Sequence, residues 1–294
     1  MFSCLSGIFI LVGFEDGCHC TRNFSLNLPQ KYNNMLKFHI IESGYFLGDG
    51  GVMFGPVPKK YWSVKYKVDE KNMCVMSLRC LFIETETRRI LVDAGLGDKH
   101  DARLKFFQPY NQKSMVEEIR RIGYEPEEVT DVILTHLHFD HCGASTVLNE
   151  NKEAVPTFPN ATYRVSLSQW KNYRTPTLFE KGSFFPENIE PVYDRGQLQF
   201  VLGDTELDDQ IRLELYDGHT PGQIVVLFET NGEKYAFPGD VVPTSLNIAL
   251  SWLSAYDNSV AVAMEEKKRF LDKAKKDKRT LIFYHDAYTT MTKL

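Results

Sequence analysis

Residues 131–143 restrict the possible folds of this chain more than any other stretch. An apolar run, DVILT, leads directly into an H-x-H-x-D-H pattern formed by His136, His138, Asp140 and His141. A buried strand that ends in a turn can aim such side chains at one small volume. Neutral imidazole and carboxylate are ligands that suit a divalent ion such as Zn²⁺. The stretch therefore predicts a metal site at the end of a strand.

Three later residues of ligand type also stand where predicted strands end. His219 lies in YDGHTPGQ, before a Pro-Gly turn, Asp240 ends the run YAFPGD, and His285 follows the apolar run LIFY. Each of them alone is a weak signal. Together with the H-x-H-x-D-H pattern they make a set of ligand-type residues at the ends of strands.

Hydrophobic periodicity predicts strands interleaved with helices. We expect helices at 113–122, 166–173 and 259–276, and strands at 37–41, 74–84, 89–92, 131–135, 161–165, 197–201, 211–216, 223–229, 233–238 and 280–284. Gly123 is expected to cap the first helix, and residues 45–62, rich in Gly, Pro and aromatics, are interpreted as a structured loop. Such interleaving, with hairpin-like strand pairs, is typical of one mixed α/β layered domain.

Charge and cysteine content narrow the function classes. A net charge of −5 leaves no overall positive field with which to hold nucleic acid or an anionic membrane. The 6 cysteines are irregularly spaced and form no CxxC pair, which favours buried free thiols and a cytoplasmic location.

Residues 1–34 precede the first predicted strand and are expected to be a poorly structured extension. Their apolar run, LSGIFILVGF, is shorter than the ~20 residues that span a bilayer. No Lys or Arg precedes it, unlike the start of a secretory signal. The functional domain is therefore placed at 35–294.

These motifs resemble those of the metallo-beta-lactamase superfamily over residues 35–294. The likeness rests on VDAG at 92–95, THLHFDH at 135–141, GHTPG at 218–222, GD at 239–240 and His285. It implies an α/β fold, an αββα sandwich with a metal site at one edge. It also implies two divalent metal ions, most simply zinc: one held by His136, His138 and His219, a second held by Asp140, His141 and His285, and Asp240 bridging both.

The resemblance also implies an activity, that of a metal-dependent hydrolase. A hydroxide held between two metal ions would attack a carbonyl or phosphoryl centre. Asp140 and Asp240 are the expected catalytic residues, with Asp140 as proton shuttle, and Asp93 is expected to support the ligands. The same ligand types accept Mn²⁺, Fe²⁺ or Co²⁺, so the sequence does not select the metal.

Within the superfamily the chain resembles the quorum-quenching acyl-homoserine lactonases. RRIGYEP before THLHFDHCG, GGVMFGPVPKKYW at 50–62 and GDVVPTSLNIALSWLSAYD at 239–257 carry this likeness. It implies ring opening of N-acyl-homoserine lactones or of a related lactone or ester. Pro243 stands where some lactonases have a tyrosine, so Tyr256 or Tyr45 would have to supply a phenol donor.

Aromatic residues in the loops predict an apolar pocket for a small-molecule substrate. The residues expected to contact it are Phe46, Phe54, Trp62, Trp252 and Tyr256. Three alternatives stay open. The first is an aryl-ester, organophosphate or thioester hydrolase of the same fold, and the second is a metal-binding protein without turnover. The third is a homodimer in which the 45–62 segment forms an interface instead of a pocket.

Overall fold

Two six-stranded sheets form the framework of the protein, whose computed structural model describes residues 36–99 and 102–294. The first sheet contains, in spatial order, β1 (Lys37–Asp49), β2 (Met73–Glu84), β3 (Arg89–Val92), β4 (Asp131–Ile133), β7 (Thr162–Ser166) and β8 (Leu198–Val201). The second contains β14 (Met291–Lys293), β13 (Thr280–Ile282), β12 (Glu233–Phe237), β11 (Gln223–Thr230), β10 (Ile211–Tyr216) and β9 (Thr205–Asp208). The extension predicted at 1–34 lies outside the described residues.

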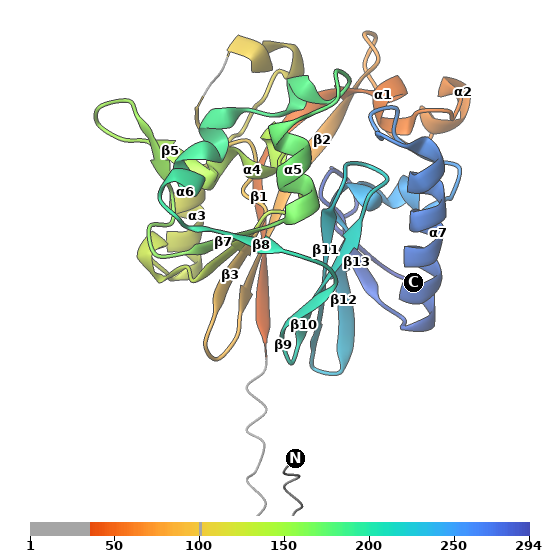
Figure 1. Cartoon of the computed structure of the whole chain (residues 1–294). Helices are drawn as coiled ribbons and strands as arrows, with labels where there is room; N and C mark the ends of the chain where they lie inside the picture. Colours follow the sequence, from red (N-terminus) through yellow and green to blue (C-terminus); the bar gives the residue numbers. More distant parts are fainter. Residues whose placement is uncertain (1–35, 100–101) are drawn as a thin grey trace, which may run out of the picture. The chain divides into compact units, whose positions relative to one another are not determined.

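Strand β11 shows why the second sheet is covered on both faces. Alternate side chains of a strand point to opposite faces, and its sequence QIVVLFET is apolar on both. Ile224, Val226 and Phe228 enter the large core that includes residues of the first sheet. Val225 and Leu227 enter a second core, formed with helix α7 (Val260–Lys276), which runs along the second sheet (Figure 1). The apolar run thus places one sheet between a helix and another sheet.

Helices also pack against the first sheet. Helix α3 (Met115–Ile122) contacts β1, and helix α5 (Leu167–Arg174) contacts β7. The order of helix, sheet, sheet and helix confirms the predicted αββα sandwich. The other helical segments are α1 (Gly50–Phe54), α2 (Lys59–Trp62), α4 (Phe139–Cys142), α6 (Glu190–Asp194) and 3₁₀ turns at 102–107, 126–128, 143–145, 181–183, 186–188, 239–241 and 245–248. No helix of the described ranges is long and apolar enough to cross a membrane.

Most predicted elements are present, within a few residues at each end. The helices predicted at 113–122, 166–173 and 259–276 are confirmed, and Gly123 ends the first of them in a left-handed conformation with φ +109°. The prediction of a loop over 45–62 was wrong for most of that range. Strand β1 continues to Asp49 after an irregularity between Glu42 and Tyr45, and the short helices α1 and α2 follow it.

Short strands were missed where apolar alternation is weak. These are β9, β14 and the two-stranded pair β5 (Thr146–Leu148) and β6 (Ala154–Pro156). β14 follows 280–284, so that run does not contain the last strand. Most of their residues are exposed or half-buried. Backbone pairing to a neighbouring strand defines these elements, and a hydrophobic pattern does not record such pairing.

Candidate metal centre

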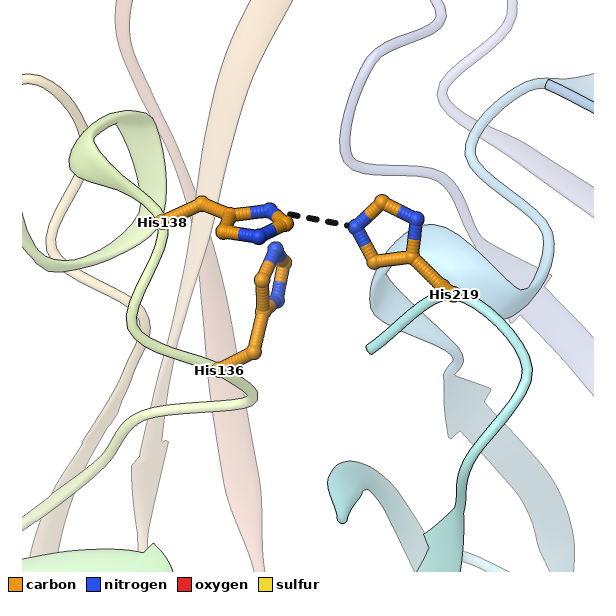
Figure 2. A group of neighbouring side chains, drawn as sticks. All are labelled: His136, His138 and His219. Carbon is orange, nitrogen blue, oxygen red and sulfur yellow. Dashed lines mark hydrogen bonds between the residues drawn. The ribbon is translucent and has the colours of Figure 1, made fainter. Parts of the chain in front are cut away.

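Three histidines from two separate segments turn their rings toward one another (Figure 2). His136 and His138 follow β4, and His219 follows β10. One nitrogen atom from each of the three lies within 4.8 Å of the others. His138 Nδ1 lies 3.2 Å from His219 Nε2. These are the residues predicted to hold the first ion, and the fold brings them together.

A second group forms beside the first. Ligand atoms of Asp140, His141 and His285 also lie within 4.8 Å of one another. Asp240 stands between the groups. Its Oδ1 is 3.5 Å from His141 Nε2 and 3.4 Å from His285 Nε2, and its Oδ2 is 3.6 Å from His219 Nε2. The carboxylate of Asp240 therefore faces both groups, as a bridging ligand must.

Local turns aim these side chains. The short helix α4 begins directly after His138, and the chain reverses so that Gly143 N donates to Gly95 O at 2.7 Å. A Cβ on Gly143 would lie 1.9 Å from the Leu96 carbonyl oxygen, so this approach requires glycine. Gly239 meets a different requirement: its φ of +52° lies in the left-handed region that glycine adopts readily, and it turns the chain directly before Asp240. Close backbone contact thus holds the ligand loops at the ends of the strands.

Each imidazole of the centre is held through its other ring nitrogen. Such contacts set the orientation of a ligand and the tautomer that it presents. The pairs are His136 Nδ1 with Thr135 Oγ1 (3.1 Å), His138 Nε2 with Glu180 Oε1 (2.9 Å), His141 Nδ1 with Asp93 Oδ2 (2.9 Å), His219 Nδ1 with Asp257 Oδ1 (3.0 Å) and His285 Nδ1 with the Ser77 carbonyl oxygen (3.0 Å).

The inward-facing atoms provide a test of whether metal ions fit here. His136 Nε2, His141 Nε2 and Asp240 Oδ1 are buried, and none has a hydrogen-bond partner in the described part of the chain. A buried polar atom left unpaired costs about 1–3 kcal/mol. Ligation of divalent ions is the arrangement that would satisfy all three atoms at once, and imidazole with carboxylate is a donor set suited to zinc. The residues therefore fit two ions.

At His136, His141 and Asp240, electrostatics favours the protonation states that metal binding needs, whereas at His219 and His285 burial is outweighed by neighbouring carboxylates, which raise the pKa of the imidazole. Burial lowers the pKa of His136 and of His141 well below the ordinary value, so both imidazoles are neutral. Burial alone would raise the pKa of Asp240, but the nearby His285 and His141 outweigh it and hold this pKa well below its usual range. The bridging position thus carries a carboxylate, and the two imidazoles offer lone pairs.

Supporting residues were only partly foreseen from the sequence. Asp93, expected to support the ligands, accepts hydrogen bonds from Thr135 N (2.7 Å) and Thr135 Oγ1 (2.8 Å) as well as contacting His141. Glu180 and Asp257, which hold His138 and His219, were not singled out. Glu180 lies in none of the quoted motifs, and Asp257 is the last residue of the 239–257 stretch but was given no role there. Each reaches its histidine from about 40 residues away, so no local signal marks the contact.

A cavity of about 310 Å³ opens onto both ligand groups, within the range of small-molecule sites. Its apolar wall consists of Phe46, Val52, Met53, Phe106, Phe107, Phe139 and Phe179, and its polar lining of Asp49, Glu180, Ser183 and Tyr256 beside His138, Asp140, His219 and Asp240. None of the described residues that line it is a lysine or an arginine.

The structure places the five predicted substrate contacts in different environments. Phe46 and Tyr256 line the cavity. Phe54 and Trp62 do not, because they are buried in the core, with ring centroids 5.3 Å apart. Trp252 packs edge-on against Phe54, away from the cavity. The aromatic pattern predicted burial correctly but did not distinguish the wall of a pocket from the core beneath it.

Comparisons with known proteins agree with this geometry. The sequence model of the family described as the metallo-beta-lactamase superfamily matches residues 79–285. An N-acyl homoserine lactonase of Bacillus thuringiensis is 26% identical over 261 residues, which are 82% of this chain and 92% of the relative. A probable metal-dependent hydrolase from Staphylococcus aureus is similar in structure, with a TM-score of 0.82 and 26% identity over 88% of this chain and 92% of the other. AidC, a dizinc quorum-quenching lactonase, shares the fold, with a TM-score of 0.70 and 20% identity over 88% and 90% of the two chains.

Proposed function

Since this chain belongs to the metallo-beta-lactamase superfamily and is a hydrolase of that family, we propose that it opens the ring of lactones that carry an apolar acyl chain, with N-acyl-homoserine lactones as the substrate class. One observation carries the proposal: the cavity that reaches both ligand groups has a mostly aromatic wall, and its described lining contains no lysine or arginine. Such a cavity suits a neutral, amphipathic ester better than a charged substrate.

The proposal includes two divalent ions, zinc first. His136, His138 and His219 would hold one, Asp140, His141 and His285 the other, and Asp240 would contact both. When bound, such ions supply an activated water as nucleophile and polarise the substrate carbonyl.

Tyr256 is the side chain that we assign to the substrate carbonyl. Its ring lies edge-on to His219, with ring centroids 5.1 Å apart. Its hydroxyl is buried on the cavity wall and has no hydrogen-bond partner in the described ranges. A substrate oxygen in the cavity would accept this hydrogen bond, which gives the otherwise unpaired group a function. Tyr256 would thus take the position of the donor that Pro243 cannot provide.

Asp140 is the residue that we assign to proton transfer. It lines the cavity, and its Oδ2 lies 3.5 Å from His285 Nε2. Burial raises the pKa of this carboxyl above its ordinary value, which favours a group that can take up a proton and release it. The expected transfer is to the alkoxide oxygen that leaves as the lactone ring opens.

The charge of the cavity bears on the alternative substrates. Asp49 and Glu180 are acidic, and away from the proposed metal ions the described lining has no lysine or arginine to pair with a carboxylate or phosphate of the substrate. Moving an unpaired anion out of water is costly. Glutathione thioesters and nucleotides are therefore disfavoured, whereas a neutral aryl ester or phosphate triester is compatible with the same wall.

The buried free thiols of Cys74, Cys80 and Cys142 support the further proposal of a reducing, cytoplasmic location.

A substrate panel on the zinc-loaded full chain tests the proposal. The panel contains N-hexanoyl-homoserine lactone, a p-nitrophenyl ester, a neutral aryl phosphate triester and a glutathione thioester. We expect kcat/KM to be highest for the lactone, and Tyr256→Phe to lower it by about 10–100-fold without loss of thermal stability. Faster hydrolysis of the thioester or the triester than of the lactone would contradict the proposed substrate class.

A further inference from the structure

Glu180 is a buried carboxylate that the reaction outlined above does not use. Its side chain is only 3% exposed. No lysine or arginine of the described residues forms an ion pair with it; its contacts are neutral amide and hydroxyl donors and one imidazole. The donors are His138 Nε2 (2.9 Å) and Thr220 Oγ1 to Oε1, and Asn172 Nδ2 (2.7 Å) and Asn258 Nδ2 (2.6 Å) to Oε2.

These donors connect Glu180 to both sides of the first ligand group. His138 is itself a ligand-type residue, and Thr220 directly follows His219. Asn258 directly follows Asp257, whose Oδ1 holds His219 Nδ1 at 3.0 Å. One carboxylate thus contacts His138 and the two segments that position His219. A displacement of Glu180 would therefore shift the imidazoles of both His138 and His219.

Glu180 also belongs to a segment that forms part of the cavity wall, residues 177–185. Phe179 and Ser183 of this segment line the cavity. Leu178 is 95% exposed and Phe179 is 64% exposed, so these apolar side chains contribute little to holding the segment in place. Phe184 provides a second contact to the metal centre, with its ring centroid 5.4 Å from that of His138. The segment is therefore held at two places: Phe184 and Phe185 are buried in the large core, and the carboxylate of Glu180 is bound at His138 and its neighbours.

We propose that Glu180 is a positioning residue that couples metal binding at His136, His138 and His219 to the ordering of the 177–185 segment. A carboxylate on the outer nitrogen of a ligand histidine makes the inner nitrogen a better donor to metal. Thermodynamic linkage then requires that metal at the inner nitrogen tightens the contact to the carboxylate. The cavity wall contributed by Phe179 and Ser183 is thus set when the metal site is filled. The inference rests on the proposed function only where it assigns the cavity to substrate.

Zinc binding by the full chain tests this coupling without any substrate. The chain is stripped of metal by a chelator, and Zn²⁺ affinity is measured by chelator competition. Hydrogen exchange of peptides covering 177–185 is followed with and without Zn²⁺. In Glu180→Gln, an amide N–H replaces one carboxylate oxygen and faces groups that now donate hydrogen bonds to that oxygen. Glu190→Gln is the matched control, because Glu190 accepts from Tyr173 and Arg174 and contacts none of the ligand residues.

In the wild type, we expect Zn²⁺ to slow exchange of the 177–185 segment by about tenfold or more. Glu180→Gln should bind Zn²⁺ about 10–100-fold more weakly and lose that slowing, while Glu190→Gln behaves like the wild type. Unchanged zinc affinity in Glu180→Gln, or equal slowing in it, would overturn the proposal, and so would a wild-type segment that does not respond to Zn²⁺.

A second variant keeps the test valid if Glu180→Gln does not fold. Asn172→Ala removes one donor to Glu180 Oε2 and leaves the His138 contact intact, in a helix that tolerates alanine. We expect it to lose at least half of the zinc-dependent slowing, and full wild-type slowing would count against the coupling. Neither measurement needs hydrolysis, so failure of the lactone panel and failure of the coupling are separate results.

Discussion

The two halves of the metal centre are supported by different parts of the fold. His141 and His285 are held by Asp93, directly after β3, and by the carbonyl of Ser77 within β2. The ring of Tyr284, from the segment after β13, stacks on His141 at 3.9 Å. We call Asp140, His141 and His285 the strand-supported half. It is continuous with the core, so its geometry and the stability of the sandwich depend on the same contacts.

His138 and His219 form the loop-supported half. Their outer nitrogens contact Glu180 and Asp257, which lie in irregular segments between helices and strands. Those segments also form part of the cavity wall. The difference suggests a division of roles: changes behind the strand-supported half should affect folding, whereas changes behind the loop-supported half should affect metal affinity and substrate binding.

Asp240→Asn should have the largest effect, because this carboxylate faces both halves. An amide cannot offer two anionic oxygens, so both ligand groups lose a contact. We expect zinc content measured by metal analysis to fall and hydrolysis of the preferred substrate to drop by about 1,000-fold or more. Full activity of this variant in chelator-treated buffer would refute a metal-dependent reaction.

Asp93→Asn tests the strand-supported half. The amide nitrogen of asparagine would face donors on Thr135 and His141, and a buried unpaired donor costs about 1–3 kcal/mol. Asparagine tolerates the φ of +57° at this position, so a backbone effect is not expected. Calorimetry should show Tm lower by about 5–10 °C, and bound zinc should fall from the two ions proposed above to one. An unchanged Tm would contradict the proposed link between this half and the core.

Asp257→Asn is the matching change in the loop-supported half. The substitution weakens the contact to His219 and the hydrogen bond that Asp257 Oδ2 accepts from Ser254 N at 3.1 Å. We expect about 10–100-fold weaker zinc binding with a smaller shift of Tm than in Asp93→Asn. If both variants lose stability equally, the two halves do not differ in the way described.

The smallest expected effect is a dependence of folding stability on pH, which arises from Lys267. This lysine is buried, and its ammonium donates to the carbonyls of Ala249 and Trp252, in the segment leading to Tyr256 and Asp257. Burial lowers its pKa to about 8. Between about pH 8 and 10.5 the unfolded chain therefore binds more protons than the folded one, so Lys267 makes the folded protein more stable as pH rises. Chemical denaturation at pH 8 and pH 10 should show this rise in the wild type and a smaller one in Lys267→Met. If the wild type and Lys267→Met show the same pH dependence, the rise in stability comes from other titratable groups.

The parts of the molecule that could be predicted are those whose geometry is local in the chain. The H-x-H-x-D-H stretch could be interpreted because its geometry is local: a buried strand, a turn and four ligand-type side chains are consecutive in the chain. Helix α7 could be predicted for the same reason, from its own periodicity. Phe54 and Trp62 could not be placed. Each stands at the end of a short helix whose sequence has no clear periodicity, so its neighbours depend on the tertiary fold. Trp62, for example, packs so closely on Gly50 that a Cβ there would lie 2.3 Å from its ring.

The amino-acid sequence by itself determined the ligand types, their places at the ends of strands and the superfamily to which the chain belongs. Only the tertiary structure decided how each histidine is held and which side chains surround the cavity. Glu180 and Asp257 reach His138 and His219 across 42 and 38 residues. Hydrogen bonds between segments that are distant in the chain leave no periodic pattern, because they depend on how the two sheets pack together and not on neighbours in the sequence.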